Sequence, residues 1–117
     1  MHIARWDDVE GKAVADPGAT GVTIRVLMGE NVGAANFTMR HFEVAPGGST
    51  PYHTHAWEHE VFVLSGKGTV RRKGGEAMVA PGSFVFIAPG EEHSFGNVGD
   101  VPFTFLCVIP SARVCLR

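Results

Sequence analysis

Four of the six histidines in this sequence fall at positions from which their side chains can meet. Three lie in the segment HTHAWEH, at His53, His55 and His59, and His93 follows a Pro-Gly turn. In a β-strand the side chains of residues i and i+2 point to the same face, so His53 and His55 can present two imidazoles to one metal ion. Because neutral imidazole is the commonest metal donor among side chains, donors from two separate strands indicate a metal site at the mouth of a barrel.

The same alternation of side chains selects a third ligand. Provided that no β-bulge interrupts the strand, His59 shares its face with Val61 and Val63, whereas Glu58 and Glu60 point to the other face. This parity favours His59 over either glutamate. The predicted metal ligands are therefore His53, His55, His59 and His93.

The sequence carries few other chemical signals. His2 and His41 stand alone and are expected to be ordinary surface or core residues. Residues 66–68, Gly-Lys-Gly, are interpreted as a hairpin turn rather than a phosphate-binding loop, and no serine-nucleophile signature is present. The glutamates beside the predicted ligands are expected to be solvated or to orient an imidazole: Glu58, Glu60, Glu91 and Glu92.

Four neutral donors would leave the full charge of a divalent ion uncompensated, so the site should act as a Lewis acid and attract an anionic ligand. An octahedral ion would keep two open positions, which suit a bidentate substrate or a substrate beside dioxygen. The first hypothesis is an oxygenase that cleaves or oxidises a small aromatic or enolisable molecule. The alternatives are a non-redox isomerase or lyase, and a non-enzymatic module that binds or senses a small molecule.

Short strands must position these histidines. Turn signals recur roughly every 8 to 12 residues in the second half of the chain, at 46–48, 65–66, 74–75, 81–82, 89–90 and 99–100, which is typical of a sandwich or barrel. The runs between and before them are rich in β-branched and aromatic residues, and each is predicted to be a strand: 22–27, 37–44, 60–64, 69–72, 77–79, 83–87 and 103–109.

Some of these strands, such as 84–87 and 103–109, are apolar on both faces. A single small sandwich leaves one sheet face in water, so we expect a second subunit to cover it and predict a homodimer. Residues 1–20 are predicted to form an arm or edge strand. The candidates to line an apolar pocket, with core packing as the alternative role, are Trp57, Phe84, Phe86, Phe95, Phe105 and Cys107.

Two segments resemble the cupin family. Residues 47–66, GGSTPYHTHAWEHEVFVLSG, resemble the first cupin motif, and residues 82–97, GSFVFIAPGEEHSFGN, resemble the second, with Pro89, His93 and Asn97 at the expected offsets. Together they cover about a third of the chain. The position of His59, where most cupins have glutamate, resembles a subgroup of small cupins with a four-histidine site, whereas Glu91 departs from the glycine that is usual in the second motif.

This resemblance implies an all-β fold, a double-stranded β-helix or jelly-roll barrel. It also implies manganese as the metal, then iron, with zinc or nickel as further alternatives; zinc is less favoured because its structural sites are usually closed by thiolates. The expected organisation is an arm over residues 1–20, a barrel over 21–112 and a tail over 113–117.

Composition limits the partners. The 117 residues are 44% hydrophobic and 19% charged, with a formal net charge of -2, which predicts one globular domain and offers no electrostatic footprint for nucleic acid or an anionic membrane. No signal-like N-terminus and no run of about 18 apolar residues is present, so a cytoplasmic protein is expected. Cys107 and Cys115 lack zinc-site spacing and are expected to be reduced.

Overall fold

The computed structural model describes residues 1–111, and the expected tail at 113–117, the barrel's expected last residue and Cys115 lie outside them. The elements in that part of the chain are η1 (Trp6–Asp8), β1 (Lys12–Ala13), β2 (Thr20–Met28), η2 (Glu30–Val32), β3 (Phe37–Ser49), β4 (His59–Ser65), β5 (Gly68–Arg72), β6 (Gly75–Val79), β7 (Phe84–Ile87), β8 (His93–Asn97) and β9 (Phe103–Pro110). Across residues 1–111, no helix is both long enough and apolar enough to span a membrane.

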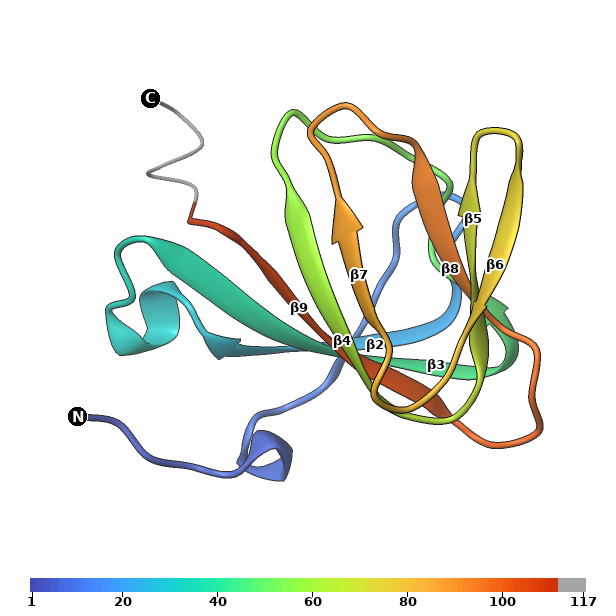
Figure 1. Ribbon diagram of the computed structural model, residues 1–117. Coiled ribbons are helices and arrows are strands. Elements are labelled where there is room, and N and C mark those ends of the chain that lie inside the picture. Colours follow the sequence, from blue (N-terminus) through green and yellow to red (C-terminus); the bar gives the residue numbers. More distant parts are fainter. Residues whose placement is uncertain (112–117) are drawn as a thin grey trace.

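The strands form one curled antiparallel sheet (Figure 1). Its order is β6-β5-β8-β3-β9-β4-β7, with β2 paired to β3 and β1 paired to β2. Apart from β5 and β6, neighbouring strands in this order are not consecutive in the sequence, so crossover connections join segments that lie far apart in the chain. The predicted all-β class and jelly-roll architecture are therefore confirmed.

All seven predicted strands are present, β8 was missed, and the structure has one further short strand, β1. β8 follows the Pro-Gly turn and was not predicted because its sequence, HSFGN, contains no β-branched residue and ends in two poor strand formers. β1 is only two residues long and pairs with β2 through Lys12 opposite Ile24. It lies inside the segment expected to be an arm or edge strand.

The predicted turn at residues 46–48 is instead an irregularity within β3. Thr20 pairs with Ser49, but Val22 already pairs with Val44, so five steps along β3 match two along β2. Gly47 has φ +79°, a conformation that favours glycine, and a Cβ on Gly48 would lie 2.5 Å from the carbonyl oxygen of Thr20. The extra residues bend β3 away from β9 and bring Ser49 opposite Gly96 on β8.

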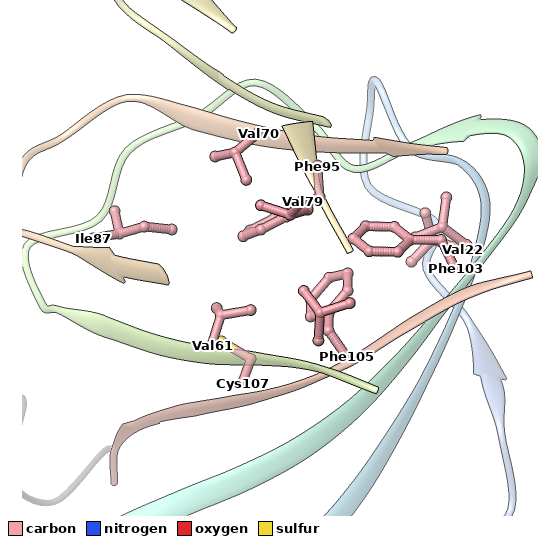
Figure 2. Close-up of a cluster of buried hydrophobic side chains, with 11 residues drawn as sticks. Val22, Val61, Val70, Val79, Ile87, Phe95, Phe103, Phe105 and Cys107 are labelled. Carbon is pink, nitrogen blue, oxygen red and sulfur yellow. The ribbon is translucent and has the colours of Figure 1, made fainter. Parts of the chain in front are cut away.

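The apolar side chains that point inward fill the space between the two sides of the curled sheet (Figure 2). In this view Val61, Phe105 and Cys107 face Val70 and Phe95 across the core. Alternation is regular on β4, where the three residues predicted to point inward, His59, Val61 and Val63, are buried and Glu60 and Phe62 are exposed. The predicted parity is therefore confirmed on this strand.

The outer face of β4 and β7 stays open to solvent in the single chain. Phe84 is 82% exposed and Phe86 is 59% exposed, and they pair with Phe62 and Glu60 on β4. Both phenylalanines were candidates to line the pocket, and that prediction is wrong, because the parity of β7 buries Ile87 instead. The exposed apolar face is the feature from which a homodimer was predicted.

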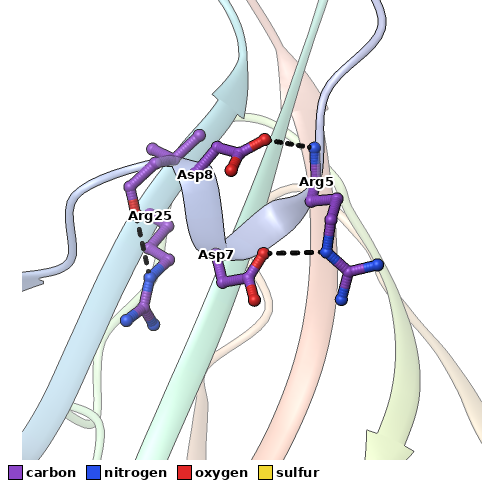
Figure 3. A network of polar contacts seen from close by, with 5 residues as sticks. Arg5, Asp7, Asp8 and Arg25 are labelled. Atoms are coloured by element: carbon purple, nitrogen blue, oxygen red, sulfur yellow. Dashed lines mark hydrogen bonds and ion pairs between the residues drawn. The ribbon is translucent and has the colours of Figure 1, made fainter.

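The N-terminal segment packs against the outside of β2 and β3 (Figure 3). The Arg5 guanidinium contacts the Asp7 carboxylate, and the backbone N–H of Arg5 donates to Asp8. Arg25 on β2 donates from Nε to the Val9 carbonyl at 3.1 Å. Trp6 stacks on the buried His41 with ring centres 4.7 Å apart, so His41 is covered by the N-terminal segment on the outer face of the barrel, away from the four predicted ligands.

Candidate metal centre

One loop and two strand starts bring the four predicted ligands to one end of the barrel. His59 begins β4 and His93 begins β8. His53 lies in the segment that follows the bend in β3, where its N–H donates to the His93 carbonyl at 3.1 Å and its carbonyl accepts from the His93 N–H at 2.9 Å. The His55 carbonyl accepts from Gly90 at 2.7 Å, which ties the ligand loop to the Pro-Gly turn.

The four imidazole rings lie close together. Ring centres of neighbours lie 4.4 Å apart for His53 and His55, 5.2 Å for His55 and His59, 4.7 Å for His59 and His93, and 4.9 Å for His93 and His53. The centres of His55 and His93, which lie across this cycle, are 6.2 Å apart.

These spacings suit ligands of a single ion. An imidazole nitrogen about 2.1 Å from a divalent ion puts its ring centre about 3.2 Å away, so rings at right angles lie about 4.5 Å apart and opposite rings about 6.4 Å apart. Among the residues that the structure describes, however, no group of three or more His, Cys, Asp or Glu side chains is placed so that it could hold a metal ion. The rings are gathered at the required spacing, and the ion stays a prediction.

The environment favours neutral imidazoles. Burial, followed by the neighbouring His93 and Arg40, lowers the pKa of His59 to about 3, and burial likewise lowers the pKa of His53 and of His55. At His93 the Nδ1 atom lies 2.9 Å from the Glu91 carbonyl, which can only accept a hydrogen bond. Nδ1 therefore donates, and Nε2 keeps the lone pair that a metal needs.

A cavity of about 220 Å³ adjoins the rings. Aromatic and aliphatic side chains form most of its wall, and its lining residues include Phe42, Phe95, Phe105, Trp57, Cys107, Arg40 and Asp16 beside the four histidines. Buried nitrogens that have no hydrogen-bond partner in the described structure include Arg40 Nε, Trp57 Nε1 and His59 Nδ1, all from lining residues. Buried polar groups are normally hydrogen-bonded, so these unpaired nitrogens indicate that the cavity binds a polar ligand.

Comparison with known proteins settles the family. The family model described as a Cupin domain matches residues 40–109, more than half of the chain. This chain is a cupin. It is similar to the 1-methylthio-D-xylulose 5-phosphate methylsulfurylase of Rhodospirillum rubrum, with 31% identity over 112 residues that make up 93% of this chain and 70% of that protein.

This cupin is also similar to two proteins with polyketide names. The tetracenomycin polyketide synthase protein TcmJ of Streptomyces glaucescens is 31% identical over 83 residues, which are 70% of this chain and 56% of that protein. The solved structure of the polyketide cyclase RemF from Streptomyces resistomycificus superimposes with a TM-score of 0.89 at 39% identity, covering 94% of this chain and 79% of that chain.

Among the glutamates around the site of this cupin, Glu91 has a structural role. Glu91, the departure from the cupin motif, accepts a hydrogen bond from the Ala88 N–H with its side chain, and its carbonyl fixes His93. It thus orients a predicted ligand through its backbone. Glu58, Glu60 and Glu92 are absent from the residues that line the cavity. Trp57, Phe95, Phe105 and Cys107 do line it, as predicted.

Two polar residues of the cavity were missed by sequence reasoning. Arg40 lies on β3 opposite Cys107 of β9, and Asp16 lies between β1 and β2. The period of β3 could have found Arg40, because it shares a face with Phe42 and the buried Val44. No local signal marks Asp16, because only the packing of the N-terminal segment carries it to the cavity.

Proposed function

We propose that this cupin is a metal-dependent enzyme that moves a proton next to a carbonyl group of a small enolisable substrate, with ring closure or isomerisation and no net oxidation. The observation that carries the proposal is the cycle of four imidazole rings in the wall of a mostly apolar cavity. Mn²⁺ is the first candidate for the ion and Fe²⁺ the second, with His53, His55, His59 and His93 as its ligands. When bound there, the ion supplies Lewis acidity that polarises the carbonyl and acidifies the neighbouring C–H bond.

The chain's own residues would complete the reaction. Asp16 is the one carboxylate among the described residues that line the cavity, and its charge acts on both His53 and His55. We assign it the role of proton acceptor, since general-base catalysis needs a carboxylate within reach of the acidic C–H bond. Trp57 stacks on His55 at 4.5 Å, and its buried, unpaired Nε1 can donate to a substrate oxygen.

Two of the relatives support this class over an oxygenase. RemF is named a polyketide cyclase, and TcmJ is named a polyketide synthase protein. Polyketides are rich in 1,3-dicarbonyl units, whose central C–H bonds lose a proton easily. The oxygenase that the sequence first suggested would use the same open coordination positions, so the two reactions must be separated by their need for dioxygen.

The test combines metal analysis with an exchange reaction. The purified protein is reconstituted separately with Mn²⁺ and Fe²⁺, its metal content is measured, and deuterium exchange at the central carbon of a panel of aryl 1,3-diketones is followed by NMR without oxygen. Metal-dependent exchange that is lost in Asp16→Asn, while the metal content is retained, is the expected result. Turnover that begins only when dioxygen is admitted would replace the proposal with an oxygenase, and saturable binding without exchange would replace it with a binding module.

A further inference from the structure

Arg40 places a guanidinium in the wall of the metal cavity. On β3 it shares its inward face with Phe42 and Val44, and its register partner on β9 is Cys107. Cys107 lies beside Val61 at the edge of the core (Figure 2). The positive charge of Arg40 contributes to lowering the pKa of three predicted ligands, His53, His55 and His59. The guanidinium therefore lies close enough to interact electrostatically with them.

The contacts of Arg40 leave most of its hydrogen-bonding capacity unused. One N–H of Nη2 donates to Cys107 Sγ at 3.0 Å, and the guanidinium carbon lies 4.9 Å above the Phe42 ring. Nε is buried and has no hydrogen-bond partner in the described structure. An arginine carries five N–H donors in a planar fork, and a buried unpaired donor is costly unless a ligand completes it.

No carboxylate neutralises this charge. Within residues 1–111 the ion pair formed is that of Arg5 with Asp7 on the outside of the barrel, so Arg40 has no carboxylate within ion-pair distance. Burial raises the pKa of the Cys107 thiol, an effect that Arg40 opposes, and a thiol is a weak hydrogen-bond acceptor that carries no charge at neutral pH. The charges in the cavity would be a divalent ion, the Arg40 guanidinium and the carboxylate of the exposed Asp16, which sum to two net positive charges.

We propose that Arg40 is a binding subsite for an oxyanion of the substrate, a carboxylate or phosphate group that its fork holds while the reacting carbonyl faces the four histidines. This assignment rests on the proposed function and adds a substrate class to it: a small, mostly apolar molecule that carries one oxyanion. Bidentate pairing with a carboxylate or phosphate is the geometry for which a guanidinium is suited, and a largely apolar wall strengthens such a pair.

Cys107 is the positioning residue for this subsite. Its sulfur accepts from Nη2, and the Phe42 ring supports the guanidinium. These two contacts hold the fork in one orientation while Nε stays unpaired. Serine at position 107 keeps an acceptor at this place, whereas alanine removes it, so the two substitutions separate positioning of Arg40 from packing of the core.

The test measures binding by calorimetry rather than turnover. Benzoate and phenyl phosphate are compared with the neutral benzamide, in Mn²⁺-loaded protein whose metal content has been measured and again in metal-free protein. In wild-type protein we expect at least one of the two anions to bind about tenfold or more tightly than benzamide in both metal states, and the stronger of them identifies the oxyanion. Arg40→Gln is expected to remove this preference and to leave benzamide affinity within about twofold.

Matched variants complete the design. Cys107→Ala is expected to lose part of the preference, and Cys107→Ser to restore it. Arg25→Gln is the control, because Arg25 lies over Trp6 outside the cavity and should keep the preference. A wild-type protein that binds neither anion more tightly than benzamide, or a preference that Arg40→Gln retains, would overturn the subsite. Failure to take up metal would overturn the proposed function alone, because the preference of the metal-free protein still reports on Arg40.

Discussion

Replacing Asn97 by alanine should be one of the most destabilising single changes near the site. Asn97 is 5% exposed at the end of β8, the strand that His93 begins. Its Nδ2 donates to the carbonyls of Val44 at 2.9 Å and Val101 at 2.8 Å, and its Oδ1 accepts from the Gly99 N–H at 2.9 Å. All the hydrogen bonds are short, and the one to Val44 is fully buried.

The expected loss of stability follows from the number of hydrogen bonds that Asn97 makes. A hydrogen bond contributes about 1 kcal/mol net, and a buried partner left unpaired costs about 1–3 kcal/mol. Losing three such bonds should therefore lower the free energy of unfolding by about 3 kcal/mol, a large share of the roughly 5–15 kcal/mol of a typical domain. Asn97→Asp should cost at least as much, because its carboxylate oxygen would face two carbonyl oxygens.

Asn31 provides a matched control. It makes the same kind of bonds, with Nδ2 at 3.3 Å from the carbonyls of Val26 and Leu27 and Oδ1 at 2.8 Å from the Gly29 N–H, but its side chain is exposed. Water can replace the two exposed bonds to carbonyls, and only the bond from the buried Gly29 N–H is part-buried, so Asn31→Ala should cost about 1 kcal/mol. Urea denaturation, monitored by circular dichroism, measures the free energy of unfolding of both variants. Equal losses in the two variants would refute the reasoning, since burial is the difference on which it depends.

Three further predictions concern the metal, the outer face and pH. His59→Ala should sharply lower the Mn²⁺ or Fe²⁺ content measured by elemental analysis while the circular dichroism spectrum is kept; unchanged metal content would remove His59 from the ligands. The wild-type protein should sediment as a homodimer and Phe86→Asp as a monomer, because Phe86 lies on the exposed apolar face of β7; a monomeric wild-type protein contradicts this. Burial and then Arg25 lower the pKa of His41 below 6.5, so the unfolded chain binds a proton that the folded chain excludes. Relative to His41→Phe, wild-type stability should therefore fall by up to about 1.4 kcal/mol per pH unit as the pH drops below about 6.5, and parallel pH profiles of the two proteins would contradict it.

Local patterns predicted the features that depend on neighbouring residues. The alternation of β4 placed His59, Val61 and Val63 on one face, because successive side chains of any strand point to opposite sides. The same rule predicts Arg40 on the inward face of β3, once Val44 is known to be buried. β8 escaped prediction because its pairing with β5 and β3, rather than its own composition, makes it a strand.

The sequence by itself determined the strand class, the inward parity of the ligand strand and the clustering of three histidines within one short segment. The sequence also predicted His93 as the fourth member, but only the tertiary structure shows how it meets the others: the bend in β3 at residues 46–48 carries His53 onto the start of β8. The tertiary structure also decided that Arg40 meets Cys107, 67 positions away in the chain, and that Phe84 and Phe86 face outward. The physical reason is that side-chain alternation is a property of the local backbone, whereas meeting across the barrel depends on the register and curvature of the whole sheet.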